Sequence, residues 1–168
     1  MEIYKSNKEK IITYIVFSVY ILLLVWLVLF KFATNIEEIP HLRGINLIPF
    51  HYDKENAVHV REVFYNVMVF VPAGFYFSAI FAKKNVFLGT AATAVMSLLF
   101  EAVQWIFAIG ATDITDFITN TVGGFCGMLL FLILGKITLR HRMTIINILG
   151  MIIEILGGML LLLLLISN

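Results

Sequence analysis

Five long apolar stretches determine what this 168-residue chain can fold into. Each is close to or above the length of about 20 residues that an α-helix needs to cross about 30 Å of hydrocarbon. The stretches are residues 11–30, 63–82, 86–109, 117–135 and 143–166. We therefore predict an all-α fold, a polytopic membrane helical bundle with about five transmembrane helices.

The composition excludes a soluble monomer. Hydrophobic residues make up 61% of the chain and charged residues 14%, whereas soluble domains average about 45–50% apolar and about 25% charged residues. We expect a single membrane domain over residues 1–168. The sole cysteine, Cys126, excludes an intramolecular disulfide. No nucleotide-binding or redox motif indicates a cofactor.

The distribution of positive charge predicts the orientation of the helices. With the N-terminus in the cytoplasm, eight Lys and Arg residues lie inside: Lys5, Lys8, Lys10, Lys83, Lys84, Lys136, Arg140 and Arg142. Four lie outside: Lys31, Arg43, Lys54 and Arg61. This bias follows the positive-inside rule and predicts a cytoplasmic N-terminus and an extracytoplasmic C-terminus. The connections 33–62 and 110–116 then face outward.

Polar side chains inside the predicted spans are the strongest indicators of a functional site, because burying them in lipid is costly. Glu101 and Gln104 lie one helical turn apart on the same face of the third span, in its outer half. A buried carboxyl needs a partner or a raised pKa, and a second polar group beside it indicates a pocket or water-filled cleft. For this pair we rank a functional role above packing.

Further polar residues fall at the same outward level of the neighbouring spans. Asp113, Asp116 and Asn120 repeat at i, i+3 and i+7 around the start of the fourth span. Asn66 follows Glu62 by one turn at the start of the second span. Asp113 or Asp116 has an alternative role as a helix cap, and each asparagine has one as an interhelical hydrogen-bond partner.

Two other features of the spans are separate from this cluster. Glu154 lies near the middle of the fifth span, where we expect it to be protonated or paired with another helix. Gly123, Gly124 and Gly127 contain a GxxxG spacing, which predicts close packing of the fourth span against another helix.

The long outward connection after the first span carries an apolar segment, residues 44–50, between two arginines. Pro49 biases the preceding residue toward extended geometry. We expect the segment to lie along the membrane surface or to fold over the helix ends, with Asn46 hydrogen-bonded. The flanking Arg43 and Arg61 suit phosphates or carboxylates. Interfacial anchoring or pairing with acidic residues is their alternative role.

Taken together, these segments resemble the VanZ family over residues of about 43–135. The residues that carry the resemblance keep the family's order and spacing: Asn46-Leu47-Ile48-Pro49-Phe50, Arg61-Glu62, Asn66, Pro72, Gly74, Glu101, Gln104, Asp113, Asp116, Asn120, Gly123 and Gly124. The extra C-terminal span, 143–166, lies outside this region. VanZ-like proteins are small multi-spanning bacterial membrane proteins, named for a protein associated with resistance to the lipoglycopeptide teicoplanin.

The resemblance implies a location in the bacterial cytoplasmic membrane and a contribution to teicoplanin-type antibiotic resistance. One departure concerns an arginine that family members often carry just before the aspartate motif. This chain has Ile109-Gly110-Ala111-Thr112 there. A role of that arginine applies here only if Arg43 or Arg61 takes its place.

Two functions are consistent with the sequence. In the first, an outward-facing polar cleft binds a lipid-linked cell-wall intermediate or a lipoglycopeptide. The candidate binding residues are Arg43, Asn46, Arg61, Glu62, Asn66, Glu101, Gln104, Asp113, Asp116 and Asn120. In the second, a membrane enzyme acts on a polyprenyl-linked or phospholipid substrate. Its general base, or the ligands of a divalent cation such as Mg²⁺, would then be Glu101, Asp113 or Asp116.

We prefer the binding function, because the chain shows no nucleophile–base pair and no histidine within the spans. His51, Asp53 and His59 match no specific zinc pattern, so no metal site is predicted. The expected partners are the lipid bilayer and one of these ligands, and nothing indicates nucleic acid.

Overall fold

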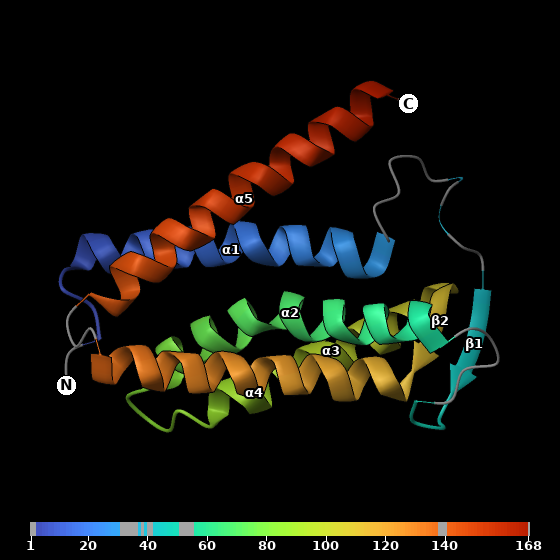
Figure 1. Ribbon diagram of the computed structural model, residues 1–168, viewed down its shortest axis with the longest axis horizontal. Coiled ribbons are helices and arrows are strands. Elements are labelled where there is room, and N and C mark those ends of the chain that lie inside the picture. The colour runs from blue at the N-terminus through green and yellow to red at the C-terminus, as the bar shows by residue number, and fades with distance from the viewer. Residues whose placement is uncertain are drawn as a thin grey trace. The chain divides into compact units, whose positions relative to one another are not determined.

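The computed structural model describes residues 3–30, 37, 39, 42–50, 56–137 and 141–167. Five helices and two short strands follow one another in this part of the chain (Figure 1). In chain order they are α1 (Asn7–Phe30), β1 (Leu42–Asn46), α2 (Asn56–Phe81), α3 (Leu88–Phe107), β2 (Ile109–Asp113), α4 (Ile114–Ile137) and α5 (Arg142–Ser167).

All five of these helices are long and apolar enough to cross a membrane, which confirms the predicted class of fold. The bounds of all five helices differ from the predicted spans by at least one residue, and two of these differences bear on the connections between the helices. α2 begins at Asn56, before the predicted start at residue 63. The predicted third span, 86–109, is too long, because α3 ends at Phe107. Ala108 takes a left-handed conformation with φ of 54°, and Ile109 enters a strand.

Two compact units divide the chain: residues 1–39 and 132–168 form unit 1, and residues 40–131 form unit 2. In unit 1, α1 packs against α5. Asn147 Nδ2 of α5 donates a hydrogen bond of 2.8 Å to Thr13 Oγ1 of α1, and both residues are buried. Such bonds satisfy polar groups that are costly to leave unpaired in a membrane.

In unit 2, glycines allow α2, α3 and α4 to approach one another closely. A Cβ added at Gly127 of α4 would overlap the carbonyl oxygen of Val71 in α2. A Cβ added at Gly124 would lie 2.6 Å from the Cβ of Thr93 in α3. The close packing predicted for the fourth span is therefore confirmed, and it involves two neighbouring helices.

β1 and β2 form a parallel two-stranded sheet, which the sequence analysis did not predict. The register pairs Leu42 with Ile109 and Asn46 with Asp113. Both strands contact α3, so the apolar segment that begins at residue 44 folds over a helix end, one of its two expected placements. Figure 1 shows the sheet at the end of unit 2 opposite the turn between α2 and α3. We call this the sheet end of unit 2.

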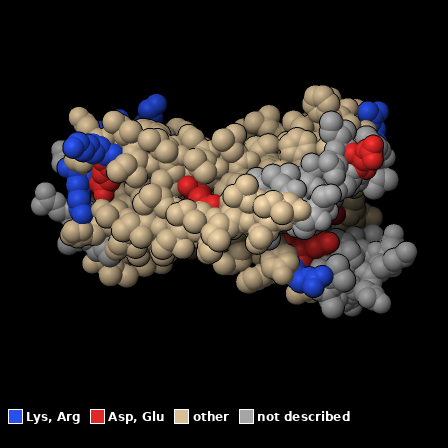
Figure 2. Space-filling view, turned by 90° about the horizontal axis from the view of Figure 1, so that it is seen from above, with Lys and Arg blue, Asp and Glu red and all other residues tan. Residues whose placement is uncertain are grey.

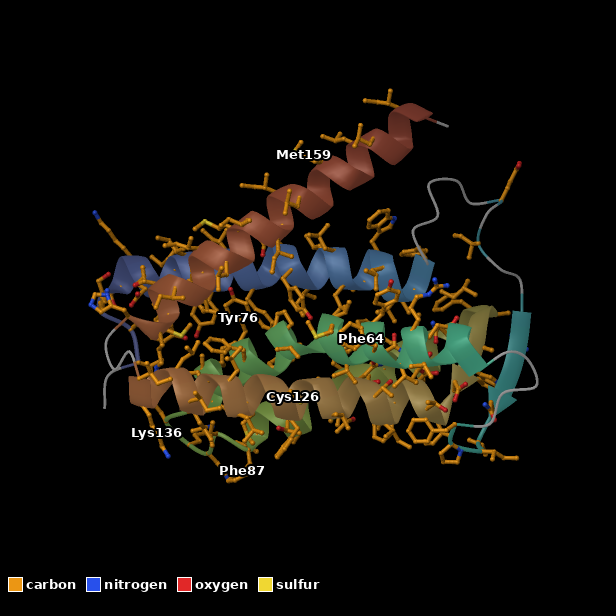
Figure 3. All side chains as sticks on the ribbon, in the orientation of Figure 1. Phe64, Tyr76, Phe87, Cys126, Lys136 and Met159 are labelled. Carbon is orange, nitrogen blue, oxygen red and sulfur yellow. The ribbon has the colours of Figure 1, made fainter. Side chains whose placement is uncertain are left out.

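Charged side chains avoid most of the surface that the apolar helices present. On the face shown in Figure 2, the blue Lys and Arg side chains lie at the ends, and the area between them is mostly uncharged apart from one small red acidic patch. Within α4, Lys136 lies in the last turn, away from β2 (Figure 3). This separation is typical of a chain whose middle lies in hydrocarbon.

Candidate functional site

The sheet end of unit 2 brings together most of the polar residues that the sequence singled out. The local cause is the end of α3, where the Ala108 N–H bonds back to the carbonyl oxygens of Gln104 and Trp105. The chain then enters β2, and α4 begins at Ile114 directly after it. Asp113 is therefore the last residue of a strand and the residue before a helix.

Asp113 links β1, β2 and α4 through its carboxylate. Oδ1 accepts a hydrogen bond of 2.7 Å from the N–H of Thr115, in the first turn of α4. Oδ2 accepts one of 3.1 Å from Asn46 Nδ2, across the sheet. The alternative role of Asp113 as a helix cap is thus confirmed.

Glu101 holds β2 against α3. Its side chain is buried at 6% exposure, and Oε2 accepts a hydrogen bond of 2.9 Å from the Asp113 N–H. Thr112 Oγ1 donates to the Glu101 carbonyl oxygen at 3.1 Å, so both groups of Glu101 bind the same strand. Gln104, buried one turn later, packs against Gly110, where an added Cβ would lie 3.3 Å from its Nε2.

Two asparagines connect the helices of unit 2, as their alternative roles predicted. Asn66 Nδ2 of α2 donates to Asp116 Oδ1 of α4 at 2.7 Å. Asn120 Nδ2 of α4 donates to Ser97 Oγ of α3 at 2.9 Å, and both of these residues are buried. Asn120 Oδ1 is also buried and has no hydrogen-bond partner among the described residues.

Arg43 lies on the outside of this network. Its guanidinium stands 5.5 Å from the centre of the Trp105 ring, and Nη2 donates to the Ile106 carbonyl oxygen at 3.3 Å. The side chain stays exposed. The strand register places Arg43 opposite Gly110, within the segment that lacks an arginine of its own. An arginine that lies over an aromatic face keeps its charge and most of its donors available.

The two remaining candidate binding residues lie on α2, and both are exposed: Arg61 and Glu62. Arg61 forms no hydrogen bond or ion pair with another residue in the described part of the chain. His51 and Asp53 lie outside the described residues, as does the side chain of His59. In the part of the chain that the structure describes, no group of three or more His, Cys, Asp or Glu residues is placed to hold a metal ion.

Sequence reasoning missed the contribution of Thr115. Its side chain is fully buried, and Oγ1 accepts a hydrogen bond of 3.0 Å from the Phe50 N–H. Phe50 has a φ of 56°, which is rare for a bulky residue and requires support from its surroundings. Nothing in the local sequence pairs residues that lie this far apart.

The sheet end thus defines a class of protein: a small multi-spanning membrane protein in which polar side chains join three packed helices to a strand pair. A family model described as VanZ/LLP1 matches residues 17–135. Protein VanZ from Enterococcus faecium is 44% identical to this chain over 124 residues, which cover 73% of this chain and 74% of that protein. No solved structure matches. The chain therefore belongs to the VanZ/LLP1 family.

Proposed function

We propose that the sheet end of unit 2 faces the outside of the bacterial cytoplasmic membrane and binds an amphiphile with an anionic head. The ligand is a lipid-linked cell-wall intermediate or a lipoglycopeptide, and binding contributes to teicoplanin-type antibiotic resistance. The family relationship and the similarity to protein VanZ from Enterococcus faecium support this choice of ligand class.

The observation that carries the proposal is the exposed guanidinium of Arg43, supported by Trp105 and Ile106. A planar guanidinium binds phosphate or carboxylate through two parallel hydrogen bonds, and an aromatic face holds it ready at low entropic cost. Arg61, which has no described partner, supplies a second cation on α2. Arg43 thus takes the place of the arginine that β2 lacks.

Exposed apolar side chains on the segment that follows β1, the strand of Arg43, suit the rest of an amphiphile. Leu47 is 70% exposed, Ile48 60% and Phe50 56%, all on the segment that follows β1. Such residues are costly in water and favourable at the boundary between head groups and acyl chains. An anionic head at Arg43 and an apolar tail beside Phe50 therefore fit one ligand.

The engagement of the carboxylates favours binding over catalysis. Asp113 uses both oxygens to hold Asn46 and the start of α4, and Glu101 uses one to hold β2. A general base needs an oxygen directed at its substrate. We assign Glu101 and Asp116 the role of charged acceptors that hold β2 and Asn66 in the arrangement that the ligand binds, with the cap Asp113 positioning β1.

Resistance measured in a susceptible bacterium that expresses the chain tests the proposal. Arg43→Gln removes the charge and should weaken ligand binding about tenfold or more, because hydrogen bonds to charged groups contribute about 1.5–3 kcal/mol. Lys84→Gln removes one exposed cation at the opposite end of unit 2 and should leave resistance unchanged. If both variants confer equal resistance at equal expression, Arg43 is not the residue that binds the anionic head group of the ligand.

A further inference from the structure

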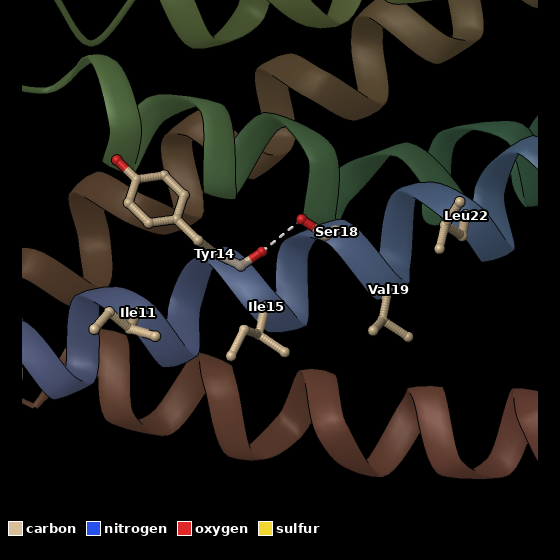
Figure 4. Close-up of a pocket in the computed structure, with 6 residues that line it drawn as sticks. All are labelled: Ile11, Tyr14, Ile15, Ser18, Val19 and Leu22. Carbon is tan, nitrogen blue, oxygen red and sulfur yellow. Dashed lines mark hydrogen bonds between the residues drawn. The ribbon is translucent and has the colours of Figure 1, made fainter.

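An open apolar groove of about 350 Å³ runs along one face of α1, outside the site described above. Figure 4 shows the residues that line it: Ile11, Tyr14, Ile15, Ser18, Val19 and Leu22. They recur every three or four residues, so they form one continuous face of the helix. All six residues belong to α1, so an acyl chain in the groove would contact this face of the helix along its length.

The length of the groove matches one leaflet of a bilayer. From Ile11 to Leu22 the helix rises by about 16 Å at about 1.5 Å per residue. The hydrocarbon core of a bilayer is about 30 Å thick, so one leaflet accounts for about half of that. A single acyl chain that enters near Ile11 would therefore end near Leu22.

The Ser18 hydroxyl, the polar side-chain group in the middle of the groove, does not disfavour binding of an apolar chain. Ser18 Oγ donates a hydrogen bond of 2.8 Å to the Tyr14 carbonyl oxygen of its own helix (Figure 4). The hydroxyl is therefore satisfied before any ligand arrives. Ile15, at 59% exposure, and Leu22, at 70%, leave apolar surface for contact.

A cation lies at the N-terminal mouth of the groove. Lys10 lies one helical turn before Tyr14, and its side chain is exposed. Lys10 Nζ stands 5.9 Å from the centre of the Tyr14 ring. It has no acidic partner in the described part of the chain. The adjacent Glu9 is engaged by the Lys5 N–H and by Thr144 Oγ1. An ammonium held over an aromatic ring at a membrane surface suits a phosphate.

From this combination we propose that the α1 groove binds an anionic phospholipid of the leaflet on the N-terminal side of α1. One acyl chain lies along Ile11 to Leu22, and the head-group phosphate pairs with Lys10. The charge bias of the sequence predicts that this leaflet is the cytoplasmic one. This lipid site lies on a different helix from the site proposed at the sheet end, and it binds a different ligand.

Titration of the full chain with phosphatidylglycerol and with phosphatidylcholine, read by native mass spectrometry, tests the proposal. The wild-type protein should bind phosphatidylglycerol several-fold more tightly. Lys10→Gln should weaken phosphatidylglycerol binding about fivefold, the effect expected of one basic residue near an anionic lipid. Val19→Trp fills the groove and should weaken the binding of both lipids.

Two matched variants control for charge and for bulk. Lys136→Gln removes an exposed cation from the end of α4, and Ile152→Trp adds the same side chain to the exposed face of α5. Both should bind phosphatidylglycerol as the wild type does. Equal wild-type affinity for the two lipids would overturn the proposal. So would matching results for Lys10→Gln and Lys136→Gln, or for Val19→Trp and Ile152→Trp.

Discussion

Asp113 shows how a residue with a structural role positions a site for binding. Its carboxylate caps α4 and holds Asn46, while its N–H binds Glu101. Because β1 also carries Arg43, the same bonds fix the position of the guanidinium. A binding site on a connection needs such support, since an unsupported loop orders only at an entropic cost when the ligand binds.

The charges of Glu101 and Asp116 can be removed without removing their hydrogen bonds. Glu101→Gln keeps an acceptor for the Asp113 N–H, and Asp116→Asn keeps one for Asn66. We expect both variants to fold and insert but to lose resistance, because a charged acceptor binds a donor about twice as strongly as a neutral one.

The matched control for these two variants is Glu154→Gln, which makes the same change in α5 of unit 1. Glu154 Oε1 is buried without a partner among the described residues, a setting that disfavours a charge. Its replacement should therefore have little effect on resistance. Full resistance in Glu101→Gln and Asp116→Asn would show that resistance does not depend on the charges of these two side chains.

Asn46 and Asn85 provide a second matched pair. Each accepts a hydrogen bond through Oδ1 from the N–H two residues later, at 3.1 Å in Asn46 and 3.0 Å in Asn85. Only Asn46 also binds Asp113. Asn85→Ala should cost about 1 kcal/mol of stability, and Asn46→Ala more, because it also removes a hydrogen bond to a carboxylate. Only Asn46→Ala should lower ligand affinity. Equal ligand affinity of the two variants would argue against positioning of Arg43 by β1.

Hydropathy reveals the helices of this chain because a membrane span is a local property of about 20 consecutive residues. The sheet depends on pairing between residues 42–46 and 109–113, which lie far apart in the sequence. The strand at 109–113 was divided between a predicted span and a loop, since its first residue, Ile109, extends the apolar run. The helical rise along each span predicted that Glu101, Asp113 and Asn66 lie at the same depth in the membrane. Which hydrogen bonds these side chains form could be seen only in the folded structure.

Close approach of α2 and α4 makes Gly127 a sensitive position of unit 2. Gly127→Ala places a methyl group against the Val71 carbonyl oxygen and should destabilise the protein by about 1–3 kcal/mol. Gly158→Ala in α5 adds the same group where nothing lies within 4 Å, so its thermal stability should be unchanged or slightly higher. Thermal unfolding in detergent compares the two. An equal Tm would show that α4 does not need this glycine.

At the scale of the whole molecule, the charge bias predicts which end of unit 2 faces out. In a Cys126→Ala background, Asp53→Cys should react with a membrane-impermeant maleimide in intact cells, and Lys84→Cys only after lysis. This follows from the eight-to-four distribution of Lys and Arg between the two sides. Labelling of Lys84→Cys alone in intact cells would reverse the topology and move the sheet end to the cytoplasm.

Mass spectrometry of the small molecules that remain bound to the gently purified full chain tests ligand binding at the sheet end most directly. Cells grown with teicoplanin offer both ligand classes at once. The wild-type protein and Lys84→Gln should retain a polyprenyl-linked intermediate or the drug in excess of its share of the membrane. Arg43→Gln should lose that excess. Conversion of the retained lipid over time would instead indicate an enzyme. Retention of ordinary phospholipids alone by the wild-type protein would contradict the proposed function.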